Sequence, residues 1–172
     1  MRYEIDYFSR SGNSKRLADA VEKLFRLRDT EFIDLHYDEP TEASDAYIIV
    51  FSMNRGTVPL RVMDTLDVLA GKTILCLVTL GAEEPSDYQD KLEQKLKPFL
   101  PERCDYRGSY LCRGEFPESV VAAAVKQLET EPDNEYAHMV SECCTQAKGH
   151  PDRTDVENAC AFVCDKLNLY RQ

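Results

Sequence analysis

Tryptophan is absent from this chain of 172 residues, and histidine and glycine are scarce, with three and seven copies. The seven cysteines include no C-x-x-C pair, so the sequence gives little support for a zinc ribbon or a ferredoxin-type iron–sulfur cluster. No apolar run approaches the length that spans a bilayer, and residues 1–8 lack the apolar stretch of a signal peptide. We therefore expect a cytoplasmic protein with no membrane partner.

Basic residues are also in the minority, with 21 Lys and Arg against 31 Asp and Glu, for a formal net charge of −10. This balance argues against a nucleic-acid partner, because non-specific binding of nucleic acid needs cationic groups that displace phosphate counterions. An acidic surface can steer a basic protein partner into contact, and it can equally serve solubility alone. The charge leaves both explanations open.

The cysteines of a cytoplasmic protein are expected to stay reduced. Cys76 lies inside the apolar run 74–78 and is most simply a small core residue. The adjacent Cys143 and Cys144 could bind a soft metal or undergo redox chemistry, but a plain structural role is the simpler interpretation. We predict no metal site and no catalytic residue.

The patterns that are present alternate between strand and helix. Length and composition suit one domain over residues 1–172. Continuous apolar runs indicate strands buried on both faces, and one-sided apolar stripes indicate helices. The predicted strands are 3–8, 31–36, 46–51, 73–80 and 106–112, and the predicted helices are 14–28, 59–70, 86–100, 117–128 and 152–169. The less regular stretch 131–152 is expected to include a short helix at 136–146.

Five strands alternating with helices predict an α/β fold, a doubly wound five-stranded parallel sheet with helices on both faces. Ligands of such folds bind beyond the carboxyl ends of the strands, where the strand order reverses. The loops 9–14, 52–57 and 81–88 should gather at this edge.

The first of these loops, residues 9–14, reads Ser-Arg-Ser-Gly-Asn-Ser between a strand and a helix. Unpaired N–H groups and the helix dipole attract an anion to such a turn, and hydroxyls can donate to phosphate oxygens. Gly12 allows the backbone to close around the ligand. The alternative is that Ser14 merely caps the helix and the rest is a polar loop.

These loops resemble those of the flavodoxin family. Residues 9–14 are similar to the family's hydroxyl-x-hydroxyl-Gly-Asn-hydroxyl loop, which holds the FMN phosphate. Ser52 followed by Gly-Thr-Val-Pro at 56–59 looks like the second flavin loop, and Thr-Leu-Gly-Ala at 79–82 is in the place of the third. The segments 112–114 and 149–152 resemble a short flavodoxin-like subgroup that includes companions of reductases.

The resemblance implies that the cofactor is FMN. It also exposes a departure, since flavodoxins usually place an aromatic residue in the second loop, where this chain has Met53, Asn54 and Arg55. Met53 could cover a ring face, Arg55 could stabilise the anionic reduced flavin, and Tyr88 is the aromatic candidate of the third loop. The residues expected to bind FMN are Ser9, Arg10, Ser11, Gly12, Asn13, Ser14, Ser52, Met53, Asn54, Arg55, Gly56, Thr57, Thr79, Leu80, Gly81, Ala82 and Tyr88.

Other proteins with this topology fit less well. A response-regulator receiver needs acidic residues where this chain has Ser9 and Ser52, and a low-molecular-weight phosphatase needs a cysteine nucleophile inside the first loop. His150 is expected to shape its Gly-His-Pro turn, and His36 and His138 are interpreted as structural.

The leading functional hypothesis is an FMN-binding electron-transfer protein that accepts electrons from a reductase and passes them to an acceptor enzyme. One variant is a flavin reductase that acts directly on a small acceptor such as a quinone. The alternative is a non-redox accessory subunit of a larger reductase with weak or no FMN binding. Flavodoxin-like accessory subunits, among them the companion of gut bilirubin reductase, provide that analogy.

Overall fold

The computed structural model describes residues 1–36, 40–82 and 85–171, with the side chains of 34–36 and 171 left aside. Within these residues five strands form one sheet in the order β2-β1-β3-β4-β5, and every neighbouring pair is parallel. The strands are β1 (Tyr3–Phe8), β2 (Phe32–His36), β3 (Ala46–Ser52), β4 (Thr73–Leu80) and β5 (Asp105–Arg113). The predicted doubly wound parallel sheet is confirmed.

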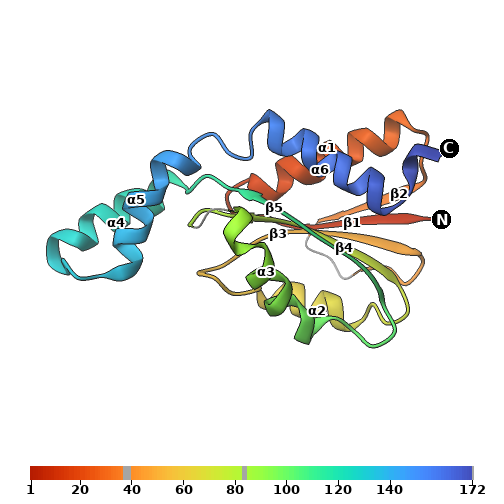
Figure 1. The fold of residues 1–172 in the computed structure, drawn as a ribbon, viewed down its shortest axis with the longest axis horizontal. Coiled ribbons are helices and arrows are strands. Elements are labelled where there is room, and N and C mark those ends of the chain that lie inside the picture. Colours follow the sequence, from red (N-terminus) through yellow and green to blue (C-terminus); the bar gives the residue numbers. More distant parts are fainter. Residues whose placement is uncertain (37–39, 83–84, 172) are drawn as a thin grey trace.

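Helices cover both faces of this sheet, as predicted (Figure 1). They are α1 (Asn13–Leu27), α2 (Leu60–Asp67), α3 (Pro85–Leu96), α4 (Glu118–Thr130), α5 (Glu135–Ala147) and α6 (Arg153–Lys166). Helices α1 and α6 lie on one face, and α2 and α3 lie on the other. None of the helices in the described part of the chain is both long and apolar enough to cross a membrane.

The core lies on both sides of the sheet because side chains of a strand alternate between its faces. In the central strand β3, Ile48 belongs to the cluster under α1 and α6, and Ile49 belongs to the cluster over α2 and α3. Both are fully buried, as is Cys76 of β4. The continuous apolar runs of the sequence therefore correspond to strands with no solvent-exposed face.

Helices α4 and α5 form a pair that we call the helical arm, residues 118–147. The two helices pack mainly on each other, around Ala124, Ala137 and Val140. The Asn134 side chain caps α5 by accepting a hydrogen bond of 3.0 Å from the Ala137 N–H. The arm projects beyond the carboxyl ends of the strands, where the ligand site was expected (Figure 1).

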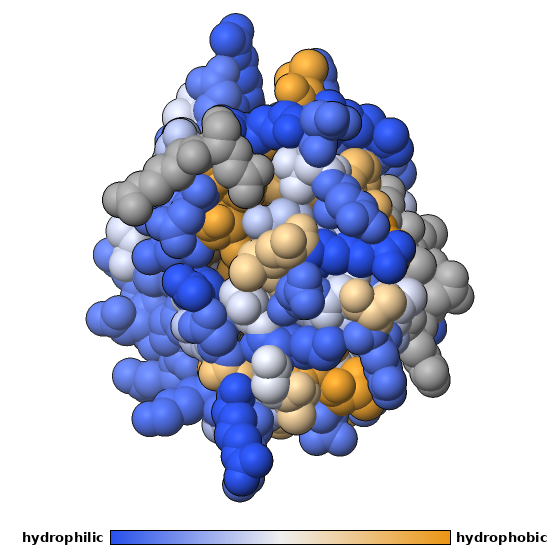
Figure 2. Space-filling model, turned by 90° about the vertical axis from the view of Figure 1, so that its right-hand side faces the viewer, coloured by the Kyte–Doolittle hydropathy of each residue, from blue (hydrophilic) through white to orange (hydrophobic). Residues whose placement is uncertain are grey.

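The opposite end of the molecule, where both chain termini lie, is mainly hydrophilic (Figure 2). Apolar atoms appear there only as small separate spots on the visible face. The last helix, α6, is shorter than the predicted 152–169 because it ends at Lys166 and the chain turns at Asn168, with φ 55°. A left-handed residue of this kind stops a helix.

Candidate functional site

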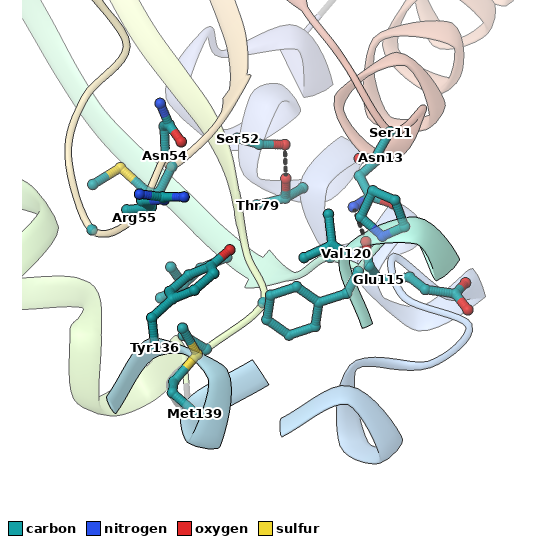
Figure 3. A pocket seen from close by; sticks show the side chains of 18 of the residues that line it. Ser11, Asn13, Ser52, Asn54, Arg55, Thr79, Glu115, Val120, Tyr136 and Met139 are labelled. Atoms are coloured by element: carbon teal, nitrogen blue, oxygen red, sulfur yellow. Dashed lines mark hydrogen bonds between the residues drawn. The ribbon is translucent and has the colours of Figure 1, made fainter. Parts of the chain in front are cut away.

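The carboxyl ends of β1, β3 and β4 bring the three predicted loops around one cavity of about 370 Å³ (Figure 3). Most of the predicted site residues line it: Ser11, Asn13, Ser52, Met53, Asn54, Arg55, Gly56, Thr79, Leu80, Gly81, Ala82 and Tyr88. A smaller depression of about 240 Å³ contains Gly12 and shares Ser11 and Asn13 with the main cavity. One site therefore has a polar loop at one end and a largely apolar space at the other.

The first loop is shaped for an anion. Gly12 precedes α1 with φ 91°, a conformation that favours glycine, and no side chain caps the helix. The Gly12 N–H donates a 3.0 Å hydrogen bond to Ser9 Oγ, and the first turn of α1 contains no acidic residue. Nothing lies within 4 Å of the position where a β-carbon on Gly12 would stand. The open space and the uncapped helix end together suit a phosphate group.

The Ser14 side chain contacts the second loop. Its side chain is fully buried at the second position of α1, and Ser14 Oγ lies 3.0 Å from Ser52 Oγ. Ser52 Oγ in turn lies 2.5 Å from Thr79 Oγ1 (Figure 3). These hydroxyls connect the first, second and third loops in one hydrogen-bonded chain. The alternative that Ser14 merely caps the helix is therefore wrong.

The remaining predicted residues lie outside the walls of the main cavity. Ser9 bonds the backbone of its own loop, and Arg10 is exposed to solvent. Thr57 Oγ1 donates to Asn54 O at 2.6 Å. A direct role of these side chains, and of Ser14, in binding FMN stays a prediction. Residues 83–84 of the third loop lie outside the described residues.

The second loop is a two-residue hairpin turn. Arg55 and Gly56 both have positive φ, 49° and 74°, and Asn54 and Thr57 exchange backbone hydrogen bonds of 2.9 and 3.0 Å. The Gly56 carbonyl accepts hydrogen bonds from Lys95 Nζ at 2.7 Å and from the Tyr88 hydroxyl at 3.3 Å. The loop is thus supported from α3.

Tyr88 is only 3% exposed, and its hydroxyl is engaged by this turn. The ring packs in the core cluster over α2 and α3, although part of it reaches the cavity wall. Its place therefore fits the support of the second loop better than free stacking on a ligand. Contact between Tyr88 and a bound flavin stays a prediction.

Two other aromatic residues line the cavity, and sequence reasoning missed both. Phe116 follows β5, and Tyr136 lies in the first turn of α5. The guanidinium carbon of Arg55 lies 4.8 Å from the centroid of the Tyr136 ring. Figure 3 shows the Tyr136 ring reaching from the arm side toward Arg55 of the second loop. The other lining residues missed are Gly114, Glu115, Pro117, Val120 and Met139.

Asn13 connects the first loop to the segment after β5. Its Nδ2 donates a 2.9 Å hydrogen bond to Glu115 O, and a β-carbon on Gly114 would lie 2.7 Å from the same nitrogen. The Gly149 N–H in turn donates to Glu115 Oε2 at 3.2 Å. Gly114, which the sequence marked only as part of a subgroup resemblance, therefore forms one wall of the site together with residues 115–117.

The paired cysteines of α5 have separate acceptors. Cys143 Sγ donates to Ala82 O at 2.7 Å, whereas Cys144 Sγ donates to Ser141 O at 3.2 Å within its own helix. The first contact attaches the arm to the third loop. Burial raises the pKa of the Cys76 and Cys112 thiols, which keeps them protonated and uncharged.

His150 bonds the carboxylate of Asp155, with His150 Nδ1 at 2.5 Å from Asp155 Oδ2. Asp155 also forms a capping box with Asp152 at the start of α6. His138 Nε2 lies 2.6 Å from Pro132 O in the turn between α4 and α5. Both contacts are consistent with structural roles, and the side chain of His36 lies outside the described residues.

Residues 4–164 match the model of the Flavodoxin domain, so the chain belongs to the flavodoxin family. Proteins of this family bind a flavin. The chain is 25% identical over 168 residues to the flavodoxin-like domain-containing protein BilS of Clostridioides difficile (strain CD3), covering 95% of this chain and 94% of that protein. It is 27% identical over 175 residues to BilS of Clostridium symbiosum (strain WAL-14163), covering 91% and 90%.

Solved structures with a similar fold include two flavodoxins. That of Megasphaera elsdenii, in its two-electron reduced form, superposes with a TM-score of 0.51 at 16% identity, over 68% of this chain and 89% of that one. That of Streptococcus pneumonia TIGR4 also gives 0.51, at 15% identity, over 83% and 99%. These likenesses confirm the flavodoxin-like fold.

Proposed function

We propose that this protein binds FMN in the cavity and acts as an electron-transfer protein, taking electrons from a reductase and passing them to an acceptor enzyme. The observation that carries the proposal is the continuity of two unlike subsites. The uncapped start of α1 at Gly12 borders the smaller depression, which adjoins the main cavity through the shared residues Ser11, Asn13 and Phe116. Tyr136 lines the main cavity. A molecule with a phosphate at one end and a planar ring at the other matches both.

Different residues would bind the phosphate and the ring of FMN. The N–H groups of the first turn of α1 and the hydroxyls of Ser9 and Ser11 would hold the phosphate. The turn at Arg55 and the third loop at Gly81 would border the ring. FMN supplies the redox chemistry when bound, and the protein supplies orientation and charge near the ring.

An electron carrier fits the cavity better than an enzyme with its own acid–base machinery. Among the described lining residues there is no histidine and no cysteine. The hydroxyls of Ser52 and Thr79 bond each other rather than a general base. This chemistry favours electron exchange between a bound flavin and partner proteins over the activation of a substrate by side chains.

Titration of the purified protein with FMN and with riboflavin, followed by flavin-fluorescence quenching, tests the proposal. We expect near one-to-one binding of FMN and weaker binding of riboflavin, because riboflavin lacks the phosphate. Equal affinities would mean that the first loop does not hold phosphate. A protein that bound neither flavin would contradict the electron-transfer function and favour the accessory subunit.

The route of the electrons needs a second experiment. The flavin-loaded protein would be reduced chemically without oxygen and mixed with a quinone or with a candidate acceptor enzyme, and re-oxidation followed by absorbance. Rapid re-oxidation by the enzyme alone is the expected result. Rapid re-oxidation by free quinone alone would instead support the flavin-reductase variant.

A further inference from the structure

The helical arm touches the rest of the molecule beside the cavity. Cys143 Sγ donates to Ala82 O of the third loop at 2.7 Å, and Tyr136 lies under Arg55 of the second loop at 4.8 Å. Phe116, at the base of the arm, lies against Gly81. All of these contacts involve residues at the cavity or next to it. The arm therefore forms a wall of the site as well as a separate pair of helices.

In the three predicted loops, the one aromatic residue is Tyr88, and it is less exposed than the rings of this wall. The second loop contains no aromatic residue, and Tyr88 is buried behind that loop. Tyr136 is only partly buried and faces the cavity with its ring (Figure 3). A planar aromatic ligand that enters the cavity thus finds its aromatic neighbours on the arm side.

We infer that Tyr136 is the ring-contacting residue for the isoalloxazine of the flavin, and that the arm supplies the aromatic contact which the second loop lacks. This inference rests on the proposed function. Phe116 forms the adjacent wall, and its packing on Gly81 fixes the distance between the arm and the third loop. Met139 and Val120 complete the apolar surface around these rings.

Removal of the Tyr136 ring should weaken the binding of FMN and riboflavin by the same factor, because both ligands carry the same ring system. We expect about a fivefold loss for Tyr136→Ala, as for the loss of one aromatic contact. The ratio between the two affinities should stay constant, since the phosphate subsite at Gly12 is untouched. Fluorescence titration of both ligands measures these values.

Tyr136→Phe separates ring contact from a merely structural role. Phenylalanine keeps the apolar ring, so the affinities should stay within about twofold of the wild-type values. A phenol in contact with a flavin quenches its fluorescence by electron transfer, whereas a phenyl ring does not. The residual fluorescence of bound FMN should therefore rise in Tyr136→Phe, although binding is retained.

Tyr170→Ala is the matched control. Tyr170 is 62% exposed and also has an arginine over its ring, with the Arg28 guanidinium carbon 5.8 Å from the centroid. This variant should bind both flavins like the wild type. If the wild type bound FMN and Tyr136→Ala changed neither affinity nor fluorescence, the inference would be overturned while the proposed function stood. If the wild type bound no flavin, both would fail.

Discussion

Phe116 lies so close to Gly81 that a β-carbon on Gly81 would stand 2.6 Å from Phe116 Cζ. Real β-carbons essentially never come this close to another heavy atom, so only glycine is compatible with the observed position of the ring. The pair joins the third loop to the base of the helical arm. The spacing between the third loop and the base of the arm, two walls of the cavity, therefore depends on the lack of a side chain at Gly81.

Gly81→Ala should push the Phe116 ring away and weaken the binding of both flavins, by about threefold to tenfold. The effect should largely disappear in a Phe116→Ala background, because the clash requires the ring. A double-mutant cycle on the FMN dissociation constant measures this coupling, which we expect to be about 1 kcal/mol. Additive effects of the two substitutions would show that the contact does not control the cavity.

Gly12→Val should reduce FMN affinity more than tenfold and leave riboflavin affinity nearly unchanged. Valine resists the φ of 91° and its side chain would occupy the open space above the loop. Gly71→Val is the control, because Gly71 also has positive φ and nothing within 4 Å of a β-carbon. Both variants should lose similar thermal stability, and normal FMN binding by Gly12→Val would reduce the first loop to a polar turn.

Arg55→Ala should make the two-electron potential of the bound flavin more negative by a few tens of millivolts. A positive charge near the ring favours the anionic reduced form, by about 1 kcal/mol in a partly hydrated site. Arg55→Lys keeps the charge and should retain most of the wild-type potential. Spectroelectrochemistry decides the question, and an unchanged potential in Arg55→Ala would leave Arg55 only its contact with Tyr136.

Ser52→Ala should lower the free energy of unfolding by about 1–2 kcal/mol, since it removes the partner of the fully buried Ser14 hydroxyl. Ser14→Ala in the same background should cost less than it does alone, because the unpaired hydroxyl is then absent. Urea denaturation of the two single variants and the double variant measures the difference. Equal costs in both backgrounds would contradict a shared hydrogen-bond chain.

Asp152 predicts a pH dependence of stability. The Asp155 N–H donates to Asp152 Oδ1 at 2.9 Å and holds the carboxyl pKa below its ordinary value of 3.8. The ionised carboxylate therefore stabilises the fold at pH values above 3.8. This contribution is lost as the pH falls through the lowered pKa of the folded state. The melting temperature of Asp152→Asn should approach that of the wild type as the pH falls below 3.8. A constant difference would assign the effect to other carboxyls.

The sequence alone determined the sheet and the edge of the sheet at which the predicted loops gather. Short apolar runs such as 46–51 indicate strands buried on both faces, and a strand followed by Gly12 and a helix forms a turn whose N–H groups point outward. These are local features, because their geometry depends on a few neighbouring residues. The same reasoning placed Ser52, Thr79 and Gly81 at one edge, since parallel strands end together.

The tertiary structure decided which aromatic residues reach the cavity and what Ser14 does. Tyr136 meets Arg55 across 81 positions of the chain, and Phe116 meets Gly81 across 35. The periodicity of the sequence does not predict these contacts, because they depend on the position of the helical arm relative to the edge of the sheet. The Ser14 hydroxyl was equally free, by sequence, to cap a helix or hold phosphate. In the structure the buried Ser14 hydroxyl forms a hydrogen bond with Ser52 and does not cap the helix, because a buried hydroxyl requires a partner within the fold.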